Sequence, residues 1–173
     1  MNPLLNPIFK RKSIRQYKTQ DINDTTVRDL LDAAMAAPSA VACDPWEFIV
    51  IRDKEILAHI AEELPNGKML AAAPLGIIIC GDIKRAHAQL QSYMLQDCSA
   101  AIQNLLLAAS MLGLGACWLG VHPREERIKH IKKIFNLPEN IIPIAAIAVG
   151  HPGEEKQPGT RYNPAHVHYD KFT

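Results

Sequence analysis

Apolar residues recur along the chain at two different spacings, which predict a mixture of helices and strands. One set recurs at helical spacing: Val27, Leu30, Leu31, Ala34 and Met35. A helix over these positions would begin at Asp24 or Thr25, which suit an N-cap, and would end before Pro38. Amphipathic or long apolar stretches predict further helices over 56–64, 84–112 and 125–135. Short β-branched and aromatic runs predict strands over 46–51, 74–82, 116–121 and 141–150.

The segment from about residue 151 onward has a different character from the rest of the chain. It is rich in Pro and Gly, shows no helical periodicity and contains too few apolar residues to fold alone. It must therefore lie on another surface, either that of its own subunit or that of a partner. The alternation of Val167 and Tyr169 is weakly consistent with a terminal strand.

Length, composition and charge limit the classes of protein. A chain of 173 residues that is 48% hydrophobic can bury a real core, and we expect one domain over 1–173. Lys and Arg number 19 against 18 Asp and Glu, so the formal net charge is only +1. Such a balance gives no general field for nucleic acid or anionic membranes, and we expect neither as a partner.

Cysteine usage and the apolar tracts point to a cytoplasmic location. The four cysteines are isolated from one another, which favours buried, reduced thiols: Cys43, Cys80, Cys98 and Cys117. The apolar run near the N-terminus is too short for a signal peptide. The tract from Ala100 to Gly115 is interrupted by polar residues, so it predicts a core helix rather than a membrane span.

The stretch RKSIRQY carries the first candidate chemistry. It gathers Arg11, Lys12 and Arg15 around the hydroxyl of Ser13 in a chain that is nearly neutral. Arginine forks match phosphate oxygens in pairs, a lysine adds a point charge and a serine adds one hydrogen bond. The cluster would suit a phosphate monoester, and a solvated basic surface is the alternative interpretation.

Five stretches in this order resemble the FMN-dependent nitroreductase family: RKSIRQY, AAPSAVACDPWEFIVI, AAAPLGIIICGD, QDCSAAIQNLLLAASMLGLGACWLGV and IPIAAIAVGHPGEEKQPGTRYNPAHVHYD. The resemblance covers nearly the whole chain. It implies an α+β fold in which helices flank a central, mainly antiparallel sheet. It also implies a homodimer with two FMN sites at the subunit interface and a C-terminal tail, from about 151, exchanged with the partner subunit.

The same resemblance implies a set of flavin-binding residues. Arg11, Ser13 and Arg15 would hold the FMN phosphate and ribityl chain with Lys12 alongside, and Arg161 would complete the phosphate site. Segments near the flavin ring would be Pro38, Ser39 and Ala40 from the neighbouring subunit, Leu119 and Gly120 after the third strand, and Lys68 near N1 and O2. The plainer alternatives are a helix-ending turn for 38–40 and a surface lysine for Lys68.

Two positions depart from the family pattern. Ala42 stands where the family has Asn, which removes an amide hydrogen bond near the flavin worth on the order of 1 kcal/mol. Asp44 stands where the family has Gln, and a carboxylate beside the reduced flavin would disfavour anionic substrates. FMN binding is still expected, whereas ordinary nitroreductase specificity is in doubt.

Other polar and aromatic residues predict structure rather than chemistry. His166 and His168 share a strand spacing without a third ligand, and His130 lies among lysines on a solvated helix face, so no metal site is expected. Gln96 and Asp97 are interpreted as interface residues, with satisfied polar residues of the core as the alternative. Trp46 and Trp118 are expected in the core.

The resemblance implies an oxidoreductase in which the flavin carries the chemistry and no side chain is catalytic. NADH or NADPH would pass hydride to flavin N5 and leave, and an oxidised acceptor such as a nitroaromatic or quinone would then take its place in a ping-pong sequence. The alternative is a flavin-binding or sensing protein without efficient turnover, which the departures at Ala42 and Asp44 keep open.

Overall fold

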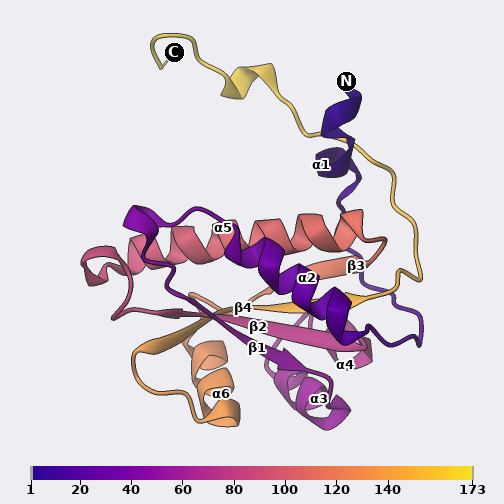
Figure 1. The fold of residues 1–173 in the computed structure, drawn as a ribbon, viewed down its shortest axis with the longest axis vertical. Helices are drawn as coiled ribbons and strands as arrows, with labels where there is room; N and C mark the ends of the chain where they lie inside the picture. The colour runs from indigo at the N-terminus through magenta and orange to yellow at the C-terminus, as the bar shows by residue number, and fades with distance from the viewer. Residues whose placement is uncertain (1, 173) are drawn as a thin grey trace.

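A four-stranded antiparallel sheet lies at the centre of the fold, with helices on both of its faces (Figure 1). The computed structural model describes residues 2–172. The strands are β1 (Trp46–Ile51), β2 (Leu75–Asp82), β3 (Gly115–Gly120) and β4 (Ile141–Gly150). Their order is β1-β2-β4-β3, and every neighbouring pair is antiparallel. The expected α+β fold with an antiparallel sheet is confirmed.

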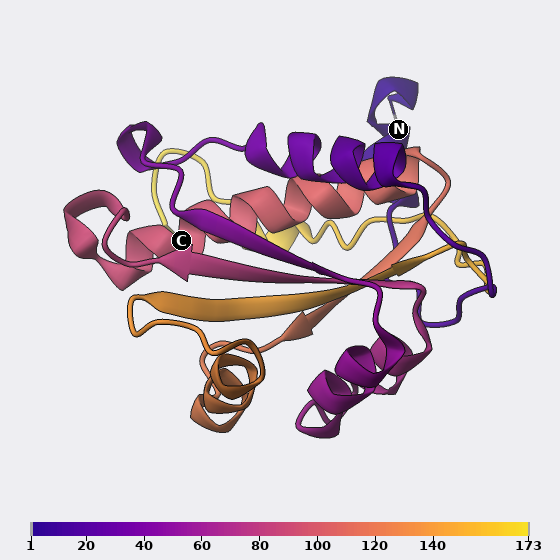
Figure 2. The same cartoon turned by 60° about the horizontal axis from the view of Figure 1, so that its bottom comes forward.

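Each face of the sheet has its own layer of helices (Figures 1 and 2). Helices α2 (Asp24–Met35) and α5 (Gln91–Met111) cover one face. Helices α3 (Lys54–Glu62), α4 (Lys68–Ala72) and α6 (Glu125–Phe135) lie on the other. The N-terminal helix α1 (Asn6–Lys10) and the short 3₁₀ turns η1 (Pro3–Leu5), η2 (Ala40–Ala42), η3 (His87–Gln89) and η4 (Pro164–His166) complete the structure.

The central strand β2 explains why the sequence pattern there is continuously apolar. Its residues alternate between the two core clusters, with Ile77 and Ile79 facing α2 and α5 and with Ile78 and Cys80 facing the opposite helices. A strand that is buried on both faces has no polar side to display, so period-two alternation is absent from its sequence. The four strands and four helices that the sequence predicts all form, several of them with shifted ends.

The largest of these shifts concerns α5, which begins at Gln91 and not at Lys84 as predicted. After β2 the chain turns, because the backbone N–H of Lys84 donates to Asp82 Oδ1 at 2.9 Å and Ala88 takes a positive φ of 51°. The guanidinium of Arg85 pairs with Glu47 at 3.0 Å. These contacts outweigh the helical propensity of residues 84–90. The five-residue helix α4 is too short to give a periodic signal and was not predicted.

The C-terminal segment follows the N-terminal segment before it leaves the body of the protein. Residues 151–159 run beside residues 9–18, with Lys18 N donating to His151 O at 2.9 Å and Gly153 N donating to Gln16 O at 2.8 Å. Beyond Gly159 the chain projects away from the helical layers (Figure 1). The expected terminal strand at Val167 and Tyr169 is wrong, since the only regular structure described there is the 3₁₀ turn η4.

All four cysteines are free thiols, as expected. Cys80, Cys98 and Cys117 are buried, whereas Cys43, which was also expected to be buried, is only half-buried in the loop before β1. Burial raises the pKa of Cys80 and of Cys98 to about 12, so both stay protonated at neutral pH. Trp46 is also in the core, as predicted. Within residues 2–172, no helix has the combined length and apolar character that crossing a bilayer requires.

Candidate functional site

A cleft of about 700 Å³ opens beside the edge strand β3. Four parts of the chain form its walls: the N-terminal segment, the connection from α3 into α4, β3 itself and the first turn of α6. The residues that line it are Arg15, Leu64, Pro65, Asn66, Lys68, Met69, Cys117, Trp118, Leu119, Gly120 and Arg127. Segments more than a hundred residues apart in the sequence therefore share one concave surface.

The backbone of β3 contributes polar groups to this cleft because β3 is the edge strand. Ile14 N donates to Ala116 O at 3.0 Å, which shows that the backbone of Ala116 points away from β4. Backbone groups of alternate residues in a strand point the same way, so those of Trp118 and Gly120 also point off the free edge. An added Cβ at Gly120 would meet no atom within 4 Å, so the backbone there is open to a ligand.

The cleft is electropositive. Arg15, Lys68 and Arg127 line it, and no Asp or Glu is among the described residues of its walls. Arg127 Nη1 donates to Gly120 O at 2.8 Å, which orients that guanidinium along the strand edge. The ring of Trp118 and the side chains of Leu119 and Met69 add apolar surface. Such a combination suits an anionic ligand that also carries a flat, apolar part.

Arg15 is held in place through its backbone. Its N–H donates to Glu154 Oε1 at 2.6 Å, and that hydrogen bond is the largest influence that lowers the pKa of Glu154 below its usual value. Glu154 is therefore ionised at neutral pH, and it remains ionised further into the acid range than an ordinary glutamate. Because the backbone is anchored by the start of the tail, the exposed Arg15 side chain remains available to the cleft.

The structure brings together only part of the predicted site. Arg15, Lys68, Leu119 and Gly120 line the cleft. Arg11, Lys12 and Ser13 are half-buried in the segment just before Arg15, but they are not among its lining residues. Lys12 Nζ instead donates to Gly159 O at 3.2 Å, so this ammonium group holds the tail.

The predicted residues Pro38, Ser39, Ala40, Ala42 and Asp44 lie in the loop between α2 and β1, away from this cleft. Ser39 Oγ donates to Asp44 Oδ1 at 2.5 Å and accepts from Asp44 N at 3.0 Å. Val41 has a φ of 48°, which is strained for a β-branched residue by roughly 1–3 kcal/mol. The exposed Arg161, in the tail, is also absent from the described lining.

Asp97 supports this loop from inside the protein. Its side chain is 5% exposed, and Oδ1 accepts from Ala40 N at 3.0 Å. The second oxygen, Oδ2, is buried with no hydrogen-bond partner among the described residues. The interpretation of Asp97 as an interface residue is therefore wrong, because α5 turns it inward to hold the loop.

Sequence reasoning missed several lining residues. Trp118, expected in the core, is 37% exposed and lines the cleft, because its strand is at the edge of the sheet. Arg127 resembles any other cation on an amphipathic helix, and Asn66 resembles any turn residue, so the sequence held no signal for either. The run GACWLGV around Trp118 contains no polar residue, so it gave no signal that the ring faces outward.

Several known proteins are similar to this chain in sequence and in structure. The sequence model of the Nitroreductase family matches residues 8–66 and 59–151. A protein of Archaeoglobus fulgidus with the provisional name NADH dehydrogenase/NAD(P)H nitroreductase is 42% identical over 99% of this chain and 100% of its own length. The FMN-dependent nitroreductase of Clostridium difficile R20291 superimposes with a TM-score of 0.89 at 30% identity, covering 97% of this chain and 99% of its own.

A second similar structure was solved with a ligand. This chain from Desulfovibrio desulfuricans, provisionally a nitroreductase, was crystallised in complex with FMN. It superimposes with a TM-score of 0.85 at 31% identity, covering 100% of this chain and 99% of its own.

Proposed function

The chain belongs to the nitroreductase family, and from that premise we propose that it is an FMN-dependent oxidoreductase that uses NADH or NADPH as reductant. The observation that carries the proposal is the electropositive cleft at the free edge of β3. Bound FMN would supply the redox chemistry, which is hydride transfer from NAD(P)H through N5 to an oxidised acceptor such as a nitroaromatic or quinone in ping-pong order.

The residues of the cleft fit FMN by their chemistry. A volume of about 700 Å³ lies within the usual range for a cofactor site. Arg15 offers a guanidinium fork for the phosphate, and Lys68 supplies a cation that would stabilise negative charge on the reduced ring. The open backbone of Gly120 and the ring of Trp118 leave a surface for a flat group. None of these residues needs to exchange a proton for this role.

We further propose that two copies of the chain complete each site. The predicted loop 38–44 and Arg161 do not reach the cleft of their own subunit, so a partner must supply them if they bind flavin. A second hollow, of about 480 Å³, is largely apolar and follows α2 and α5, with Leu107, Met111 and Leu112 among its lining residues. Met111 is 68% exposed, which favours a second copy of this chain as its cover.

The test of the proposed function is steady-state oxidation of NADH and of NADPH by the purified yellow protein, with menadione or nitrofurazone as acceptor. We expect turnover with at least one nucleotide and both acceptors. A protein that binds FMN stoichiometrically but shows no acceptor-dependent oxidation would instead be a flavin-binding or sensing protein. The loss of the family Asn at Ala42 is the observation that favours this second function.

Changing Asp44 to Asn is expected to raise activity on anionic acceptors. Asp44 has a φ of 47°, which Asn tolerates, and an amide oxygen can still accept from Ser39 Oγ. Removing a charge about 10 Å from the substrate should raise kcat/KM for a nitrobenzoate, relative to its neutral amide, roughly 2- to 15-fold at effective dielectric constants of about 80 to 20. The effect should shrink as salt is added.

The control for this experiment is Asp21→Asn, which removes the same charge at an exposed position outside the loop. If the ratio of kcat/KM for the nitrobenzoate to kcat/KM for its neutral amide is unchanged in Asp44→Asn, Asp44 only shapes the turn through its contact with Ser39. An equal rise in both variants would mean that net charge, and not the position of Asp44, disfavours anions.

A further inference from the structure

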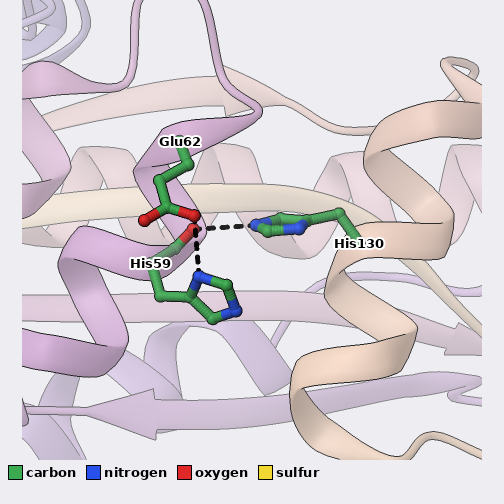
Figure 3. A group of neighbouring side chains, drawn as sticks. All are labelled: His59, Glu62 and His130. Atoms are coloured by element: carbon green, nitrogen blue, oxygen red, sulfur yellow. Dashed lines mark hydrogen bonds and ion pairs between the residues drawn. The ribbon is translucent and has the colours of Figure 1, made fainter.

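Three potential metal ligands meet where α3 and α6 pack together, on the face of the sheet opposite α5 (Figure 3). His59 and Glu62 lie one turn apart on α3, and His130 reaches toward them from α6. His59 Nδ1 donates to Glu62 Oε2 at 2.8 Å, and His130 Nε2 donates to the backbone carbonyl of His59 at 2.8 Å. The two imidazole rings are edge to face, with centroids 5.0 Å apart.

This arrangement corrects the interpretation of His130 as part of a solvated lysine face. Its side chain is half-buried, and it is held against α3 by a hydrogen bond and by the ring of His59. One of its lysine neighbours, Lys132, contacts Glu139 rather than His130. Lys132 Nζ lies 2.9 Å from the backbone oxygen of Glu139 and 3.7 Å from Glu139 Oε2. The imidazole of His130 is therefore positioned toward His59 and Glu62.

We infer that His59, Glu62 and His130 form a binding site for a divalent transition metal of the zinc class. One ligand atom from each residue lies within 4.8 Å of the other two. Two imidazole nitrogens and one carboxylate oxygen are a donor set that zinc prefers, with a water as the fourth ligand. Ligand atoms around tetrahedral zinc are about 3.3 Å apart, given bond lengths near 2.0–2.1 Å. Small side-chain rotations would close the cluster.

Binding requires little rearrangement of the helices. His59 and Glu62 are exposed, so the ion can enter from solvent and a water can complete its coordination. To bind the metal through Nδ1, a neutral His59 would shift its proton to Nε2 and a protonated His59 would release one proton to solvent, so that a neutral imidazole and the carboxylate of Glu62 become ligands. His130 would exchange its bond to the His59 carbonyl for a bond to the metal.

The site lies next to two walls of the cleft. Helix α3 continues into Leu64, Pro65 and Asn66, and Arg127 precedes His130 by about one turn of α6. A bound ion would tie together the two helices that carry these walls. Metal binding and flavin binding should then influence each other reciprocally. This coupling rests on the proposed function, whereas metal binding itself does not.

The experiment is a calorimetric titration of the full-length protein, as purified with its flavin, with zinc chloride. We expect one ion per chain, and the cobalt form should show the visible absorption of tetrahedral Co²⁺. His59→Ala, His130→Ala and Glu62→Gln should each weaken zinc binding on the order of tenfold or more. Substitutions of residues that only contact a metal ligand already lower metal affinity by about that factor. Zinc should raise the Tm of the wild type but not that of the variants.

The control is the double variant His166→Ala/His168→Ala, which removes the other closely spaced histidine pair and should leave the affinity unchanged. Glu62→Gln keeps the shape of the side chain, so its effect separates metal coordination from loss of fold, as does each variant's Tm without metal. The inference is overturned if no zinc binds, or if the tail variant removes binding while the three site variants keep it. Turnover with NAD(P)H in metal-free buffer tests the proposed function separately.

Discussion

Replacing Arg15 with Gln is expected to weaken FMN binding roughly 10- to 150-fold, which corresponds to the loss of one charged hydrogen-bonding group worth about 1.5–3 kcal/mol. Arg15 is the member of the RKSIR cluster that lines the cleft, and its backbone is fixed by Glu154. The affinity can be measured by the quenching of flavin fluorescence on titration of the apoprotein.

Riboflavin provides the internal control, because it lacks the phosphate. If Arg15 holds that group, Arg15→Gln should leave riboflavin affinity nearly unchanged while FMN affinity falls, and Arg15→Lys should keep part of the FMN affinity. Lys133→Ala, which removes one exposed charge from α6 outside the cleft, should change neither. Equal losses for the two flavins would place Arg15 against the ring system rather than the phosphate.

Ending the chain at Gly159 is expected to produce the largest effect, the loss of both the dimer and the flavin. The truncated protein keeps the contacts of 151–159 with its own N-terminal segment, including Lys12 Nζ to Gly159 O. It loses Arg161 and three exposed rings, Tyr162, Tyr169 and Phe172, the last of which is 91% exposed. Buried aromatic anchors contribute about 2 kcal/mol or more each, so the dimer Kd should rise by more than about a hundredfold.

Light scattering over a concentration series measures this change, and the flavin absorbance of the same samples reports the cofactor. Lys171→Ala is a suitable control because it alters an exposed polar residue of the tail without removing a ring. A truncated protein that stays dimeric and yellow would show that the tail is not exchanged. A monomer that keeps its FMN would show that the flavin site is complete within one subunit.

The sequence allowed the strands and main helices to be predicted because their apolar periods are strong. β1 (Trp46–Ile51) and β4 (Ile141–Gly150) have the predicted ends, and α6 (Glu125–Phe135) does too. The start of α5 was not predicted because residues 84–90 form a turn, in which Lys84 N donates to Asp82 Oδ1 and Arg85 pairs with Glu47. The partner of Arg85 lies on β1, 38 residues earlier in the chain, so no local window of sequence includes it.

Some features of the candidate site could likewise be predicted from the sequence, and others could not. The cationic chemistry of RKSIR was visible in the sequence, and so were the positions that resemble the nitroreductase family. Neither indicated that Arg127 and Trp118 share the cleft with Arg15 or that Asp97 holds the loop at Ala40. His130 was misinterpreted for the same reason, since its partner His59 is on another helix.

The sequence by itself thus determined the order of the elements, the two-sided burial of the sheet and the kinds of side chain available for a flavin. These properties follow from local periodicity and residue chemistry, which act between neighbours along the chain. Only the tertiary structure decided which cations line one cleft, which strand is left as the free edge and which histidines meet. The contacts concerned join residues as far apart as Arg15 and Glu154, and their geometry exists only once the sheet and its two helical layers have packed.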